Sequence, residues 1–175
     1  MESSSLNNLT TVKLKSLHNQ EIGYAELFSG RRIVIFSTPQ PVNTFAWEHL
    51  KKFTDLYNSI IYNKIDEVYA VSSEAMVIPF VQRHSAVVKP LHDCNKDFLT
   101  FMQQSINSSI SLNELNCFWQ YTVIVNDGKI EKLFNNPIKE NMTLKIYLNP
   151  KYHFRGVDAN TVLEYVETAP VDTKR

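Results

Sequence analysis

A short apolar run followed by a long helical stripe places the strongest constraint on how this chain can fold. Residues 33–36 read Ile-Val-Ile-Phe, an uninterrupted apolar run that is typical of a parallel strand covered on both faces. After a turn bracketed by Pro39 and Pro41, apolar residues recur at steps of three and four, which predicts an amphipathic helix capped by Thr44. The core-facing stripe of this helix is Ala46, Leu50, Phe53, Tyr57 and Ile60.

Similar patterns continue along the chain and alternate between strand and helix. Further strands are expected at 11–17 (as an edge strand), 66–72, 86–90, 118–125 and 129–134, and further helices at 24–29, 75–83, 96–104 and after Asp158. Gly30 would stop the first of these helices, and Pro79 implies a kink or a late start in the second. Asn-Asp-Gly at 126–128 is a strong hairpin signal. The alternation predicts an α/β fold with a mixed central sheet flanked by helices.

The length of 175 residues suits one domain with a substantial core. We predict that this domain spans residues 11–167, after a flexible N-terminus at 1–10 and before a tail at 168–175. An extended loop at about 135–155 is irregular except for Leu144, Ile146 and Leu148, which alternate as in a strand.

The charge balance and cysteine content exclude several functional classes. Eighteen Lys and Arg residues match 18 Asp and Glu residues, whereas a surface for nucleic acid or anionic membranes normally needs a basic excess. No apolar stretch approaches the length of a membrane span, and the first residues contain no apolar signal core. Two cysteines, Cys94 and Cys117, cannot form a disulfide framework. We therefore expect a cytoplasmic protein that binds neither nucleic acid nor membranes.

Five segments of the sequence, taken in order, resemble segments of one known protein family. They are GYAELFSGRRIVIF at 23–36, AVSSEAMVIPFV at 70–81, LHDCNKDF at 91–98, YTVIVNDGKIEKLF at 121–134 and VDANTVLEYV at 157–166. Together they resemble the peroxiredoxins, specifically the atypical two-cysteine (type 5) subfamily, over most of the chain. The resemblance implies a thioredoxin-like fold, reduction of hydroperoxides through a cysteine thiolate, and dimerisation through the face near the active site.

The family's catalytic motif, Pro-x-x-x-Thr-x-x-Cys, lacks its sulfur in this chain. The motif places the reactive cysteine on the first turn of a helix, where backbone N–H groups and a nearby arginine stabilise the thiolate. Counting onward from Pro39 puts Asn43 at the threonine position and Ala46 at the cysteine position. Neither residue can supply a nucleophile.

A second register leads to the same conclusion. If His49 and Leu50 set the alignment, Val42 takes the threonine position and Phe45 takes the cysteine position. We favour this register, because a deletion inside the helix would rotate its apolar stripe. The family's arginine corresponds to Gln120, which carries no charge.

The remaining thiols leave an alternative open. Cys94 lies in a turn and is either an ordinary turn cysteine or a reactive thiol assisted by His92 or Lys96. Cys117 begins a strand and is expected to be a small buried hydrophobe. His84, His92 and Cys94 match no metal-ligand spacing, so we expect no metal and no cofactor.

The aromatic residues near the former catalytic turn also allow two interpretations. Phe45 and Trp47 could fill the vacated peroxide pocket, or they could line an apolar groove together with Phe80 and Trp119. The sequence thus predicts a catalytically degenerate peroxiredoxin-like protein whose scaffold serves binding or assembly. A second copy or an active peroxiredoxin is the expected partner. The alternative function is a thiol-dependent redox enzyme or sensor that uses Cys94.

Overall fold

The computed structural model describes residues 9–38, 41, 43–105, 120–136, 154 and 156–169. These residues form a seven-stranded mixed sheet in the order β2-β1-β5-β4-β3-β6-β7. The strands are β1 (Leu14–Lys15), β2 (Glu21–Ile22), β3 (Arg32–Ser37), β4 (Glu67–Ser72), β5 (Lys89–His92), β6 (Gln120–Asn126) and β7 (Lys129–Asn136). The central strands β3, β4 and β5 are parallel, and the outer pairings are antiparallel. The predicted mixed sheet is confirmed.

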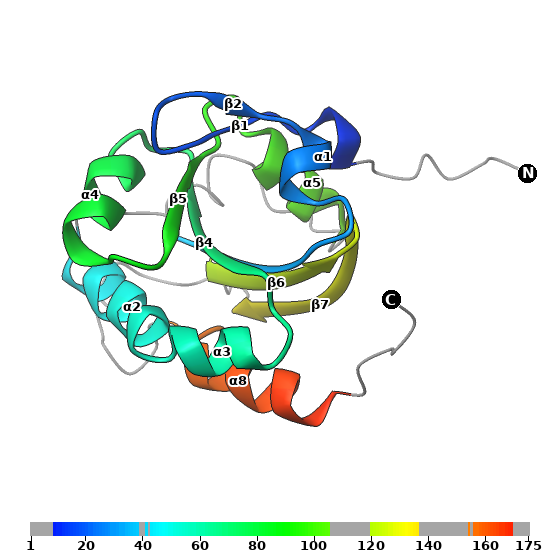
Figure 1. The fold of residues 1–175 in the computed structure, drawn as a ribbon. Helices are drawn as coiled ribbons and strands as arrows, with labels where there is room; N and C mark the ends of the chain where they lie inside the picture. The colour runs from blue at the N-terminus through cyan, green and yellow to red at the C-terminus, as the bar shows by residue number, and fades with distance from the viewer. Residues whose placement is uncertain are drawn as a thin grey trace, which may run out of the picture.

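Helices cover both faces of the sheet (Figure 1). A 3-10 helix (Leu9–Thr11), α1 (Tyr24–Leu27) and α5 (Asp97–Ser105) lie on one side. The other side carries α2 (Thr44–Asp55), α3 (Tyr57–Tyr62), α4 (Val77–His84) and α8 (Ala159–Thr168). No helix in the described part of the chain is long and apolar enough to cross a membrane.

The apolar run of β3 is explained by these two layers. Val34 and Phe36 point into the core beneath α2, α4 and α8, which we call the α2-side core. Ile33 and Ile35 point into the opposite core, beneath α1 and α5. Because successive side chains of a strand face opposite sides, a strand buried on both faces must be apolar throughout.

The prediction of a single four-turn helix after β3 is wrong. The structure has two helices there, α2 and α3, which are separated at Leu56. Thr54 Oγ1 donates to the carbonyl of Leu50, a bond that often bends a helix. The stripe nevertheless faces the core as predicted, with Ile60 still fully buried beyond the break. Tyr57 is half-buried and donates its hydroxyl proton to Glu67 Oε1 at 2.8 Å.

The N-terminal prediction also needs correction. The expected edge strand at 11–17 is only the two-residue β1, which pairs with both β2 and β5, so the edge is the unpredicted β2. Leu9 is buried in the core beneath α1 and α5, so packing begins before the predicted domain start at residue 11. Alternation in a sequence shows which face of a strand is buried and does not show which strand lies beside it.

The C-terminal elements follow the prediction closely. Asp127 and Gly128 both have positive φ, 48° and 72°, which is the two-residue turn that matches the twist of a hairpin. Asp158 caps α8 by accepting the N–H groups of Asn160 and Thr161. The extended loop predicted at about 135–155 lies almost entirely outside the described residues, as do Leu144, Ile146 and Leu148.

Candidate functional site

The carboxyl end of β3 leads to the first turn of α2, where both residues predicted at the cysteine position lie. Asn43 is the N-cap of α2, and its Oδ1 accepts the backbone N–H groups of Phe45 at 2.7 Å and Ala46 at 3.3 Å. The predicted cap, Thr44, is instead the first helical residue, in agreement with the stronger capping preference of asparagine. Two of the donors that could otherwise bind an anion or a thiolate are therefore already occupied.

Both residues predicted at the cysteine position point toward the protein interior. Ala46 is buried, and Phe45 is half-buried against the α2-side core. Pro39 and Val42 lie outside the described residues, so the choice between the two registers stays a prediction. Both candidates, Phe45 and Ala46, carry hydrocarbon side chains.

Gln120, at the predicted arginine position, is buried at the start of β6. Its Oε1 accepts the backbone N–H of Phe154 at 2.9 Å, and two residues further on Thr122 Oγ1 donates to the carbonyl of Val157 at 2.6 Å. These bonds tie β6 to the segment that leads into α8. The side chain of Gln120 thus holds the fold together at this point and brings no charge to the site.

His49 lies one turn further along α2 in an aromatic box. Its ring stacks on Phe154 at 3.8 Å between centroids and meets Phe36 and Phe53 edge-on, each at 5.1 Å. Neither ring nitrogen has a hydrogen-bond partner among the described residues. Burial, and secondarily the charge of Lys52, lowers the pKa of His49 from 6.5 to about 3, so the imidazole stays neutral.

A groove of ≈ 490 Å³ opens between the first turn of α2 and α4, which contact each other. Trp47 and Phe80 both line it, as one of the two interpretations of the aromatic residues predicted. Phe45 instead packs inward, and Trp119 lies outside the described residues. The groove is also lined by Met76, Pro79, Arg83 and His84. No sequence pattern pointed to a site role for Met76, within the segment at 70–81, or for Arg83, two residues beyond its end.

Trp47 and Met76 are unusually exposed for large apolar side chains, at 41% and 51%. Arg83 has no salt-bridge partner in the described part of the chain. The described residues that line the groove include two basic side chains and no acidic one. The groove can therefore receive an apolar group that carries negative charge.

Cys94 lies in the turn between β5 and α5 and is exposed. Its thiol contacts Asn95 Oδ1 at 3.8 Å. The first turn of α5 is occupied by Asp93, whose carboxylate accepts the N–H groups of Phe98 at 3.2 Å and Leu99 at 2.9 Å. The N–H groups at this helix N-terminus are thus taken up by the buried Asp93, which directly precedes Cys94.

The two histidines considered with Cys94 as metal ligands, and set aside for their spacing, lie apart in the fold. His92 Nε2 lies 3.2 Å from the carbonyl oxygen of Ser73, and His84 is tilted against Phe80 at the end of α4. Within the described ranges, no three His, Cys, Asp or Glu side chains gather closely enough to hold a metal ion. Cys117 lies outside those ranges.

Known proteins of similar sequence and structure define the family. No family model matches the chain. Peroxiredoxin sll1621 of Synechocystis sp. is 30% identical over 149 residues, which cover 82% of this chain and 75% of that protein.

Solved structures agree with this relationship at the level of the fold. Reduced Prx3 of Vibrio vulnificus, in complex with H2O2, superposes with a TM-score of 0.69 at 16% identity and covers 96% of this chain and 98% of its own. The 1-Cys peroxiredoxin of Plasmodium falciparum gives 0.67 at 16% identity, over 90% and 95% of the two chains. The thioredoxin-like fold predicted from the family resemblance is confirmed. By its relationship to the Synechocystis protein, the chain belongs to the peroxiredoxin family.

Proposed function

We propose that this protein is a catalytically degenerate, cytoplasmic peroxiredoxin of the type 5 kind, which lacks the peroxidatic cysteine and uses its scaffold for binding. The observation that carries the proposal is the occupied first turn of α2. Asn43 holds the N–H groups of Phe45 and Ala46, and neither of those residues carries a nucleophile. A thiol peroxidase needs a thiolate at this position, because the thiol form attacks peroxide poorly.

The binding surface in this proposal is the groove between α2 and α4. Exposed tryptophan and arginine side chains are enriched where protein partners bind most tightly, and Trp47 and Arg83 share this groove. A symmetric pairing of two such grooves would bring basic groups toward one another without an acid to compensate them. The charge therefore favours an active peroxiredoxin that presents apolar and acidic side chains over a second copy of this chain.

The catalytic half of the proposal is tested by peroxide consumption. The purified chain is mixed with hydrogen peroxide and dithiothreitol beside an active peroxiredoxin, the Cys94→Ser variant and the Cys117→Ser variant. We expect no turnover above the dithiothreitol background, and no rapid addition of oxygen in the intact mass spectrum. Turnover that disappears in Cys94→Ser would refute degeneracy and establish the thiol enzyme. Turnover that disappears in Cys117→Ser would refute it as well.

The binding half is tested separately by mixing the chain with an active peroxiredoxin from the same source. We expect a complex in light scattering after size-exclusion chromatography, which the variants Trp47→Ala and Arg83→Glu weaken. The exposed Tyr62→Ala on α3 serves as the matched control, since it removes an exposed aromatic ring outside the groove. A homodimer that Trp47→Ala dissociates would replace the mixed complex as the assembly.

A further inference from the structure

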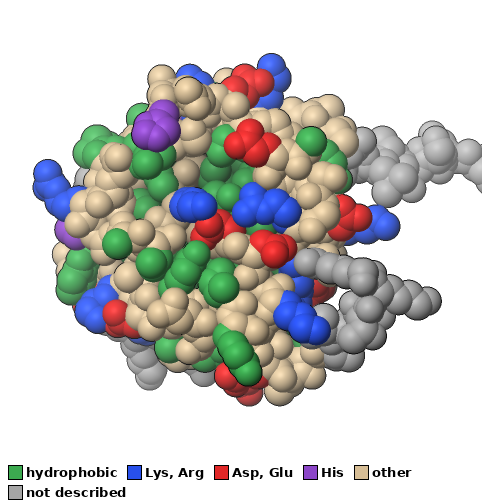
Figure 2. Space-filling model, in the orientation of Figure 1, with side chains coloured by type: hydrophobic (Ala, Val, Ile, Leu, Met, Phe, Trp, Pro, Cys, Tyr) green, Lys and Arg blue, Asp and Glu red, His purple; other side chains and the backbone are tan. Residues whose placement is uncertain are grey.

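A second pocket lies at the opposite end of the parallel strands from the α2 groove. Arg31 immediately precedes β3 and Lys89 begins β5, so the pocket opens at the amino ends of these strands. Its volume is ≈ 570 Å³, which is within the usual range for small-molecule sites. Figure 2 shows Lys and Arg side chains at the centre of this face, with hydrophobic side chains beside them.

Arg31 is held in place at this pocket, and part of its guanidinium group donates no hydrogen bond to the described residues. Its Nη1 donates to the carbonyl of Glu26 at 3.0 Å and to the hydroxyl of Tyr69 at 3.3 Å. Its backbone is fixed as well, because its N–H donates to Phe28 and its carbonyl accepts from Asp127. In the described part of the chain, no carboxylate pairs with Arg31, and its Nε and Nη2 donate no hydrogen bond.

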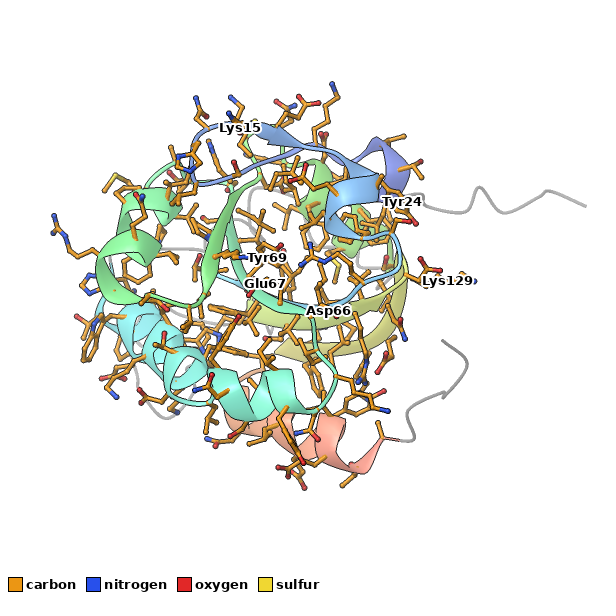
Figure 3. The ribbon with its side chains drawn as sticks, viewed as in Figure 1. Lys15, Tyr24, Asp66, Glu67, Tyr69 and Lys129 are labelled. Atoms are coloured by element: carbon orange, nitrogen blue, oxygen red, sulfur yellow. The ribbon has the colours of Figure 1, made fainter. Side chains whose placement is uncertain are left out.

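Tyr69 extends this polar end of the pocket. Figure 3 labels it on β4 beside Glu67, and its side chain is only 5% exposed. Its hydroxyl oxygen accepts from Arg31, and among the described residues no acceptor takes the hydroxyl proton. A guanidinium with free donors next to a hydroxyl that can donate is a preorganised site for a carboxylate.

The other charges near the pocket are largely paired. Lys89 forms a salt bridge with Glu67, which also accepts from Tyr57. The exposed carboxylate of Glu26 remains at the rim and reduces the attraction for an anion. Among the described residues that line this pocket, Arg31 is therefore the cation that no carboxylate pairs with.

The walls of the pocket supply the complementary apolar surface. Leu17 and Ile22 contribute from the β1–β2 hairpin, and Val87 and Val88 contribute from the segment before β5. We propose that this pocket binds a small monocarboxylate with a compact apolar body, its carboxylate on Arg31 and Tyr69 and its body against these side chains. This site is independent of the α2 groove and of the proposed loss of peroxidase chemistry.

The test is a calorimetric titration of the full chain with phenylacetate and with its neutral isostere phenylacetamide. We expect phenylacetate to bind in the range of about 1 mM or tighter, and phenylacetamide to bind at least about tenfold more weakly. Arg31→Gln should weaken phenylacetate by at least about tenfold, and Tyr69→Phe by a few-fold, without the same effect on phenylacetamide. Glu26→Gln should strengthen it, because a competing negative charge is removed.

Controls separate the site from general charge and from loss of fold. Lys129→Gln removes one positive charge from the β6–β7 hairpin and should leave phenylacetate binding unchanged. Each variant is checked by its thermal unfolding, and Tyr69→Phe keeps the test decisive if Arg31→Gln does not fold. No binding of phenylacetate up to about 10 mM, equal binding of the amide, or full binding by Arg31→Gln and Tyr69→Phe would overturn the proposal.

Discussion

The aromatic box around His49 makes acid sensitivity the sharpest quantitative prediction. The folded protein holds the pKa of this residue at about 3, mainly by burial, against 6.5 in the unfolded chain. As the pH falls below 6.5, the unfolded chain takes up a proton that the folded protein cannot accept. Stability is therefore complete above about pH 6.5 and is lost progressively down to about pH 3, at about 1.4 kcal/mol per pH unit.

The loss of stability due to His49 is large enough to measure within the pH range in which unfolding experiments are practical. Between pH 7 and pH 5, protonation of His49 in the unfolded chain alone lowers the free energy of unfolding by about 2 kcal/mol. For a chain of 175 residues, this corresponds to a fall in Tm of roughly 5 °C. His49→Phe should abolish this contribution. It should also preserve or raise stability at neutral pH, because it removes two buried nitrogens that lack partners.

The assay is urea unfolding of the wild type and His49→Phe at several pH values, compared as a difference so that other groups cancel. Glu131 also makes stability depend on pH, and the difference between the two proteins removes its contribution. Burial alone would raise the pKa of Glu131, but the hydrogen bonds and charge of Arg32 outweigh burial and lower it. The control is His18→Gln, which removes an exposed histidine outside the aromatic box. A His49→Phe variant with the same loss of stability between pH 7 and pH 5 as the wild type would refute the reasoning.

Three further predictions concern stability and are read out by urea or thermal unfolding at neutral pH. Asn43→Ala should cost about 1 kcal/mol, because α2 loses its cap; no change would mean that the cap is dispensable. Gly128→Ala should cost more than about 1 kcal/mol, because φ is positive and the new methyl group would lie 1.8 Å from the Tyr24 hydroxyl oxygen. Adding Tyr24→Ala should restore part of that loss. Glu131→Gln should cost on the order of 3 kcal/mol, because it leaves the buried Arg32 without its carboxylate, whereas Glu21→Gln, in the exposed pair with Lys13, should cost little.

The order of elements and the two-sided burial of the sheet were predictable because they depend on local periodicity. The run at 33–36, the Asp-Gly turn and the cap at Asp158 each carry their signal within a few residues, and the structure confirms all three. The start of α4 at Val77 matches one of the two outcomes that Pro79 predicted, a kink or a late start, because proline is tolerated in the first turn of a helix.

Features that depend on partners distant in sequence were not predictable. The break at Leu56 and the short β1 follow from packing and pairing that the local pattern does not encode. The α2 groove joins residues from two helices, so sequence suggested Trp47 and Phe80 and missed Arg83. Likewise, nothing local in the sequence brings Arg31 to the hydroxyl of Tyr69, 38 residues further along the chain.

The cap formed by Asn43 bears on how a cysteine introduced at the start of α2 would behave. A single codon change that placed cysteine at position 45 or 46 would give a sulfur whose nearest backbone donors are already bound to the asparagine carboxamide. Removal of the cap, in turn, costs helix stability and yields no nucleophile by itself. A cysteine at the start of α2 would therefore gain free backbone donors only together with removal of the cap, because neither change alone gives both a nucleophile and the donors that stabilise its thiolate.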